Sequence, residues 1–153
     1  MQILGLGGSW TVQQLGQTHS IPAQVPGCVH ADLLRAGQIE DPFYRDNETR
    51  VQWISWRDWV YRRSFEVSPE LLRHDRVLLR CEGLDTLATV IVNGHQLGQT
   101  DNMYRTYEFD VRDLLRPGAN DIEIRFSSAL QYIDPRQNQR PLPSWGGPHE
   151  PKG

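Results

Sequence analysis

Long apolar runs and an excess of positive charge are both missing from this sequence of 153 residues. No apolar run approaches the roughly 20 residues that a membrane-spanning helix needs. The 16 Lys and Arg are outnumbered by 19 Asp and Glu, which gives a formal net charge of -3. Because no basic surplus is available to attract nucleic acid or an anionic membrane, we expect neither as a partner.

Cysteine is also scarce, and the chain begins without the features of a leader. Cys28 and Cys81 are the two cysteines, and no metal-binding spacing relates them. Residues 1–10 have no positive flank and no apolar stretch of signal-peptide length. We therefore expect a cytoplasmic protein with two reduced, buried cysteines, a structural disulfide being the alternative.

The strongest periodicity that is present has a period of two, which is typical of strands. In residues 58–67, Trp59, Tyr61, Phe65 and Val67 share one face. The dipeptide Asn93-Gly94 indicates a tight hairpin turn. Strands are also predicted over residues 76–82, 87–92, from 95 onward, over 105–111, and after a turn at 117–120, where Ile122, Ile124 and Phe126 face inward.

Two segments depart from this pattern. Residues 29–36 have apolar side chains at helical spacing and are followed by Gly37, which predicts one short helix. Residues 131–153 hold five of the ten prolines and are predicted to be a Pro/Gly-rich loop or a truncated C-terminal extension outside a domain of residues 1–130. The fold class that follows is all-β, an antiparallel sandwich or jelly roll of roughly eight strands with one short helix.

A search for catalytic chemistry yields no candidate set. Hydrolysis of glycosides commonly uses two facing carboxylic acids, but alternation places most acidic side chains on outward strand faces. The loop carboxylates Asp41, Asp46, Glu48 and Asp101 are interpreted as turn or cap residues. No nucleophile elbow, paired histidines, P-loop or dinucleotide motif is present. We therefore predict no catalytic residue, no metal and no cofactor in this chain.

Short motifs follow one another along most of the chain. They are residues 26–34 (PGCVHADLL), 39–44 (IEDPFY), 47–48 (NE), 52–54 (QWI), 82–86 (EGLDT), 92–94 (VNG), 101–104 (DNMY), 109–111 (FDV) and 117–120 (PGAN). In order and spacing they resemble the N-terminal domain of β-mannosidases of glycoside hydrolase family 2. The resemblance spans residues 10–130 and implies a galactose-binding-like jelly roll ahead of immunoglobulin-like domains and a (β/α)₈ barrel.

The resemblance also implies a function for the longer protein. Such enzymes hydrolyse terminal β-D-mannosides with retention, and both catalytic glutamates lie on the barrel, where no position of this chain matches. The fragment alone is therefore expected to be inactive, with β-mannosides as ligands of the full-length enzyme and the barrel and immunoglobulin-like domains as partners in cis. The one implied sugar contact falls on Asn102, whose amide offers one acceptor and two donors. The alternative is that Asn102 only forms a turn with Asp101.

Two other functions stay open. A free-standing carbohydrate-binding module would present two or three coplanar exposed aromatic rings, and a pure interaction domain would make no sugar contact. An accessory domain would instead leave an apolar face exposed where its partner domain docks, and we expect Trp53, Trp56 and Tyr104 to contribute to that face.

Overall fold

The computed structural model describes residues 2–140 of the chain, and these residues form an antiparallel β-sandwich. The larger sheet has the strand order β2-β1-β3-β8-β5-β6, and the smaller sheet pairs β4 with β7. The bounds are β1 Gly8–Gln14, β2 Ile21–Val25, β3 Trp59–Val67, β4 Leu78–Cys81, β5 Leu87–Val92, β6 His95–Thr100, β7 Tyr107–Asp110 and β8 Gly118–Ser127. The predicted all-β sandwich is confirmed.

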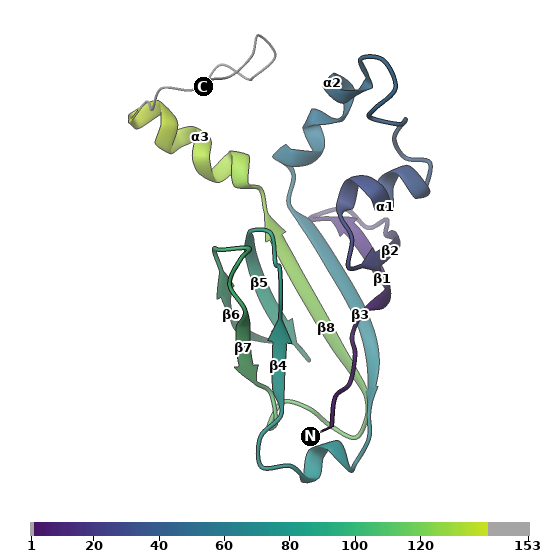
Figure 1. Ribbon diagram of the computed structural model, residues 1–153, viewed down its shortest axis with the longest axis vertical. Coiled ribbons are helices and arrows are strands. Elements are labelled where there is room, and N and C mark those ends of the chain that lie inside the picture. Colours follow the sequence, from purple (N-terminus) through teal and green to yellow (C-terminus); the bar gives the residue numbers. More distant parts are fainter. Residues whose placement is uncertain (1, 141–153) are drawn as a thin grey trace.

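The core lies between the two sheets. Val12, Tyr61, Ile124 and Val90 occupy one row across four neighbouring strands of the large sheet, and all four are buried. Side chains of β4 and β7 pack against this row from the small sheet, which lies in front of the large one in Figure 1. Alternation along each strand directs one face to this core, as the sequence pattern predicts.

Two parts of the strand prediction need correction. The strands β1 and β2 are absent from it, although Trp10 and Val12 on β1 are buried. The segment 117–120 is not entirely a turn, because β8 already begins at Gly118. Gly118 adopts a φ of 87°, which a residue without Cβ tolerates, and it pairs with Val67 at the end of the long strand β3. The partner strand thus extends the ladder into the turn residues.

Helices are more numerous than the one predicted. The predicted helix is present as α1 Val29–Arg35, and the others are α2 Asn47–Val51, the 3₁₀ turns η1 Gln52–Trp56 and η2 Leu71–Arg73, and α3 Ala129–Gln139. None of the helices in the described part of the chain combines the length and the apolar character needed to cross a membrane.

Helix α3 corrects the loop prediction for residues 131–139. The hydroxyl of Ser128 accepts a hydrogen bond from the N–H of Gln131 at 3.1 Å and so caps the helix. Pro135 lies inside the helix, where it lacks the N–H that would donate to the carbonyl four residues earlier and its ring crowds that carbonyl. The remaining residues of the predicted extension, 141–153, lie outside the described residues, and the domain boundary at residue 130 stays a prediction.

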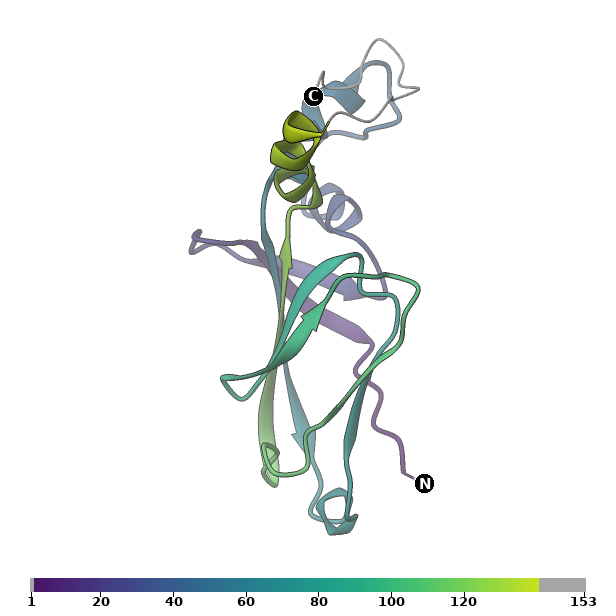
Figure 2. The same ribbon diagram turned by 90° about the vertical axis from the view of Figure 1, so that its left-hand side faces the viewer.

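The three α-helices gather at one end of the sandwich, while the N-terminus lies at the other (Figure 1). Figure 2 shows α3 continuing beyond the end of β8. The loop 101–106 begins at this same end, since Thr100 pairs with Ala88, Ala88 with Phe126, and Phe126 with Trp59. We call the region formed by α1, α2, η1, α3 and the loop 101–106 the helical end.

The cysteines follow the prediction in part. Both are free thiols, and Cys81 is buried in the core. Cys28 is exposed, which corrects the expectation of burial, because it precedes the first turn of α1 at the surface of the helical end.

Candidate functional site

The loop 101–106 joins β6 to β7 and carries Asn102, the predicted sugar contact. The hydroxyl of Tyr107 accepts hydrogen bonds from the N–H groups of Asp101 and Asn102, at 3.1 and 3.2 Å, and donates to Oδ1 of Asp101 at 3.0 Å. The ring of Tyr107 packs against the core. The start of the loop is therefore fixed to the sandwich by one tyrosine.

Asn102 itself forms a turn. Its Oδ1 accepts the N–H of Tyr104 at 2.9 Å, which differs from the predicted alternative of a turn with Asp101. Within residues 2–140 the amide Nδ2 donates no hydrogen bond, and the residue is exposed. The turn thus occupies the acceptor of the side chain and leaves its two N–H donors available. The sugar contact of Asn102 stays a prediction.

The role of the Tyr107 hydroxyl in holding the loop could not be predicted from the sequence pattern alone. Alternation predicts that Tyr107 faces inward, and its ring does so. The hydrogen bonds of its hydroxyl to Asp101 and Asn102 depend on how the loop folds back, and no spacing in the sequence signals that.

The side chains predicted to contribute to an apolar face all lie at the helical end. Tyr104 is 91% exposed and Trp53 is 40% exposed, while Trp56 is half-buried. The ring of Trp53 lies 6.1 Å from the buried ring of Trp59. Phe43, which the prediction did not include, is 97% exposed. Large aromatic side chains are therefore exposed on three different segments of this end.

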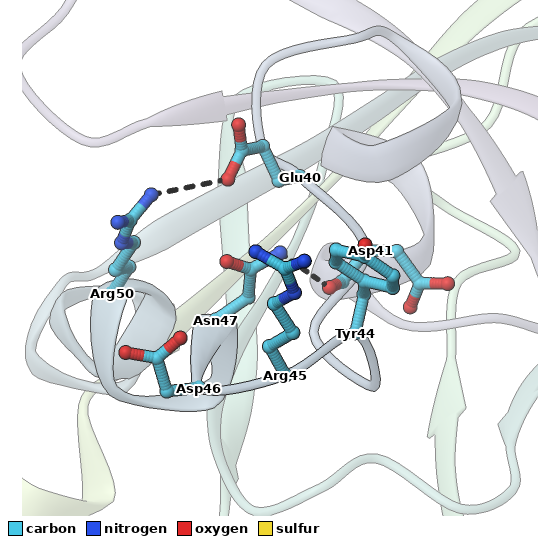
Figure 3. A pocket seen from close by; sticks show the side chains of 7 residues that line it. All are labelled: Glu40, Asp41, Tyr44, Arg45, Asp46, Asn47 and Arg50. Atoms are coloured by element: carbon cyan, nitrogen blue, oxygen red, sulfur yellow. Dashed lines mark hydrogen bonds and ion pairs between the residues drawn. The ribbon is translucent and has the colours of Figure 1, made fainter.

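A polar hollow of about 520 Å³ lies between the segment that follows α1 and the helix α2 (Figure 3). We call it pocket 40–50. Its walls are formed by Glu40, Asp41, Tyr44, Arg45, Asp46, Asn47 and Arg50.

Hydrogen bonds from Asp41 and Asn47 give this segment its shape. Oδ1 of Asp41 accepts the N–H of Phe43 at 2.9 Å, and its backbone carbonyl accepts the N–H of Tyr44 at 3.1 Å. The same carbonyl accepts Nδ2 of Asn47 at 3.0 Å, and Asn47 is buried. Asp41 is therefore a turn residue, as predicted.

The charged groups of the pocket are of both signs. Nη1 of Arg50 lies 3.3 Å from Oε2 of Glu40 in an exposed ion pair. The guanidinium of Arg45 lies 5.1 Å from the centre of the Tyr44 ring. The backbone of Arg45 has a φ of 55°, in the left-handed region that non-glycine residues seldom occupy.

A second hollow, of about 760 Å³, lies on the large sheet. Each of its charged side chains forms a hydrogen bond, and Arg63 donates to the backbone carbonyls of Leu6 and Gly7. Glu123 receives hydrogen bonds from both Arg62 and Arg125, and Ser64 bonds to Asp121. Burial alone would raise the pKa of Glu123, but the hydrogen bonds from Arg62 and Arg125 outweigh it and hold that pKa below its ordinary value.

The part of the chain that the structure describes has no metal-binding cluster. Among residues 2–140 no group of three or more His, Cys, Asp and Glu side chains is arranged to hold an ion. Oδ1 of Asp41 instead accepts a hydrogen bond within its own turn, as predicted, and Oδ1 of Asp101 accepts the hydroxyl of Tyr107 on β7.

Comparisons with known proteins match almost the whole chain. The sequence profile described as "Glycosyl hydrolase 2 galactose-binding domain-like" matches residues 10–152. The β-mannosidase of Capra hircus is 36% identical over 148 residues, which are 97% of this chain and 17% of that protein. β-Mannosidase A of Emericella nidulans is 37% identical over 139 residues, covering 89% and 15%.

Solved structures agree. A crystal structure of β-D-mannosidase from Dictyoglomus thermophilum has a TM-score of 0.90 and 40% identity, and the match covers 97% of this chain and 18% of that one. An exo-chitosanase of Amycolatopsis orientalis has a TM-score of 0.70 at 22% identity, with 78% and 16% covered, which shows likeness of fold alone. The chain spans about a sixth of the length of the relatives it matches, 17% for the first of them.

Proposed function

Since the chain belongs to the glycosyl hydrolase 2 galactose-binding domain-like family, we propose that it is the non-catalytic N-terminal domain of a retaining β-mannosidase-like glycoside hydrolase. In that enzyme a (β/α)₈ barrel hydrolyses terminal β-D-mannosides. This domain supports the barrel and contributes the loop 101–106 to one wall of the mannoside pocket.

One observation carries the proposal. β-Mannosidases match 97% of this chain at 36% identity, while the match accounts for only 17% of the first relative. Function resides in a specific site and not in a fold as such. A domain that makes up so small a share of an enzyme therefore need not hold the groups that carry out the reaction. The loop carboxylates Asp41 and Asp101 accept hydrogen bonds from Phe43 and Tyr107 that fix their loops, which agrees with an accessory role.

The exposed aromatic side chains of the helical end support a docking role. Phe43 and Tyr104 are almost fully exposed, and Trp53, on a third segment, is partly exposed. Large exposed apolar patches commonly mark a surface that another protein part covers, and these three side chains lie at the same end of the sandwich. We therefore place the exposed aromatic side chains of the loop 101–106 and of η1, Tyr104 and Trp53, against the barrel.

A free-standing carbohydrate-binding module fits less well. Such a module would stack sugars on coplanar exposed rings. The ring pairs Trp53–Trp59 and Tyr61–Phe126, found within residues 2–140, are tilted by 45° and 84°, and each includes a buried ring. Neither pair is a flat exposed platform.

Asn102 is the residue on which the sugar contact can be tested. The turn holds Oδ1 on the N–H of Tyr104, so the amide is oriented before a sugar arrives and its N–H donors can meet hydroxyl oxygens. Asn102→Asp keeps the acceptor of the turn and removes the donors, whereas Asn102→Ala removes both.

In the full-length protein both variants should lower kcat/KM for an aryl β-mannoside by about three- to tenfold, the value of one or two hydrogen bonds to a neutral group. The profile of kcat/KM against pH separates lost donors from any effect of the added charge. Asn138→Asp, on the exposed surface of α3, is the matched control and should match the wild type. Wild-type kinetics for Asn102→Asp would reduce Asn102 to a turn residue.

A further inference from the structure

We propose that Tyr107 is a positioning residue of the mannoside pocket, because its hydroxyl holds the loop 101–106 in the conformation in which Asn102 meets the sugar. The inference rests on the proposed function, since Tyr107 acts through the sugar contact proposed for Asn102. The ring of this tyrosine belongs to the sandwich, whereas its hydroxyl bonds to the loop.

The strand ends on both sides of the loop are fixed. Tyr107 begins β7, pairs with the buried Cys81 on β4, and packs its ring against the core. On the other side, the buried Thr100 ends β6. Its hydroxyl accepts the N–H of Ala88 at 3.2 Å and donates to the carbonyl of Thr86 at 3.0 Å. The loop therefore starts and ends on a rigid support.

The hydroxyl of Tyr107 uses its full hydrogen-bonding capacity on the start of the loop. A phenolic hydroxyl donates one hydrogen bond and has lone pairs that accept others. The donor goes to Oδ1 of Asp101, and the lone pairs accept the N–H groups of Asp101 and Asn102. Because these three bonds occupy the hydroxyl, Tyr107 can influence a sugar only through the loop.

The end of the loop contacts the ring of the same tyrosine. The guanidinium of Arg105 lies 5.4 Å from the centre of the Tyr107 ring. The N–H of Arg105 donates to the carbonyl of Asn102 at 3.3 Å. Phenylalanine at position 107 would keep the ring and its contact with Arg105. Tyr107→Phe therefore releases only the start of the loop, where Asn102 lies.

Order in a binding loop determines the affinity for its ligand. A loop that is ordered for part of the time binds with an apparent affinity reduced by that fraction. In the full-length protein Tyr107→Phe should therefore raise KM for an aryl β-mannoside by about two- to fivefold and change kcat by less than about 1.5-fold. A loss of folded protein would instead lower kcat at an unchanged KM.

A double-mutant cycle with Asn102→Ala tests whether Tyr107 acts through Asn102. Once the amide of Asn102 has been removed, Tyr107→Phe should change kcat/KM by less than about 1.5-fold, because the group that it positions is absent. If the double variant shows the product of the two single effects, the residues act independently and the inference is overturned.

Hydrogen exchange of the same full-length proteins reports on the loop without reference to activity. The N–H groups of Asp101 and Asn102 donate to the Tyr107 hydroxyl, so they should exchange at least about threefold faster in Tyr107→Phe. The matched control is Tyr132→Phe on α3, where an exposed tyrosine ring also lies beside a guanidinium, that of Arg136. This control should keep the exchange and the kinetics of the wild type.

The outcomes separate the inference from the proposed function. Wild-type kinetics for Tyr107→Phe with impaired Asn102→Ala would overturn the positioning role and leave the sugar contact intact. Wild-type kinetics for both variants would contradict the sugar contact itself, and the inference with it. Unchanged exchange in Tyr107→Phe would show that the hydroxyl does not hold the loop, whatever the kinetics.

Discussion

Asp32 connects α1 to two strands of the large sheet. Its carboxylate is fully buried, accepts the hydroxyl of Tyr61 at 2.8 Å and the N–H of Gln24 at 3.0 Å, and pairs with Arg35. Burial, and then the hydrogen bond to Asp32, raises the pKa of the Tyr61 hydroxyl above its ordinary value of 10.0. A buried carboxylate can be accommodated when all its hydrogen-bond partners are present. Removing one partner strongly destabilises the fold, because it leaves a buried charge uncompensated.

We expect Asp32→Asn to lower the free energy of unfolding by about 2–4 kcal/mol, because an N–H₂ group replaces an acceptor that faces donors. Urea denaturation measures the change. Asp113→Asn, whose side chain is 98% exposed, should change the stability by less than about 0.5 kcal/mol. Equal stability of the two variants would show that the hydrogen bonds of Asp32 contribute nothing to the free energy of unfolding.

Glu123 makes the stability of the fold depend on pH. Because its pKa in the folded chain lies below the ordinary value of 4.5, the carboxylate stabilises the fold above about pH 4.5. This contribution is lost as the pH falls through the folded pKa. Glu123→Gln should therefore cost about 0.5–1 kcal/mol at pH 7, a small figure since Arg62 is partly exposed.

The measurement is the melting temperature of both proteins from pH 7 to pH 3. The two curves should converge in acid. Glu108→Gln, from an exposed pair 4.0 Å from Arg80, is the control and should stay close to the wild type throughout. A constant gap for Glu123→Gln at all pH values would exclude the charge as the cause.

At the scale of elements, the helix α3 is attached to the sandwich through its first turn. Besides capping α3, the buried hydroxyl of Ser128 donates to the carbonyl of Ser55 at 2.6 Å. The N–H of Ser128 donates to Oδ1 of Asp58 at 2.8 Å. One serine thus holds α3, η1 and the start of β3 together at the helical end.

Ser128→Ala should lower the free energy of unfolding by about 1–2 kcal/mol, the usual cost of a lost N-cap with a second partner. The loss of helical signal on heating should begin earlier than the loss of the aromatic signal from the core, since α3 is released first. Ser127→Ala, at the exposed neighbouring position, should leave both signals unchanged. Simultaneous loss of the two signals would show that α3 and the sandwich unfold as one unit.

Strands with clear alternation could be predicted from the sequence, and the remaining elements could not. The strand 87–92 is found with its observed bounds, and Asn93-Gly94 forms the predicted turn, with φ of 48° and 81°. The strand β1 was not predicted, because it has only two buried apolar residues, Trp10 and Val12, and polar residues such as Gln13 and Gln14 follow them. Helix α3 was not predicted either, because Pro135 lowers the local preference, while the cap at Ser128 is a tertiary effect.

The candidate site divides in the same way. Asn102 is identified by resemblance, and its exposure on a loop follows from the turn chemistry of the segment. Pocket 40–50 has no periodic signal, because it depends on the side chain of Asn47 reaching the backbone of Asp41. Such a contact arises from the path of the chain and not from local preference.

At the scale of the whole molecule, Cys81 reports on the closure of the two sheets. It is buried between them, and burial raises the pKa of its thiol to about 11. Cys28 is exposed. Because the thiolate is the reactive form, the two cysteines should differ greatly in reactivity.

With a chromogenic disulfide reagent at pH 8, one thiol should react at once and the second in proportion to the small fraction of molecules whose sandwich is open. Asp32→Asn should accelerate the slow phase by about 30-fold for a loss of about 2 kcal/mol. Cys28→Ser should remove the fast phase and leave the slow one. Equal rates for both thiols would mean that the sheets separate more easily than their packing implies.

The order of the strands also governs how the domain is made. β3 has β1 on one edge, and its other edge pairs with β8 from Trp59↔Phe126 to Val67↔Gly118. β5 and β6 join the sheet only through β8. During synthesis the first three strands must therefore wait, with one edge of β3 open, until residues 118–127 have left the ribosome. A ribosome that stalls before residue 118 holds two incomplete half-sheets, and their open edges can pair with those of neighbouring nascent chains.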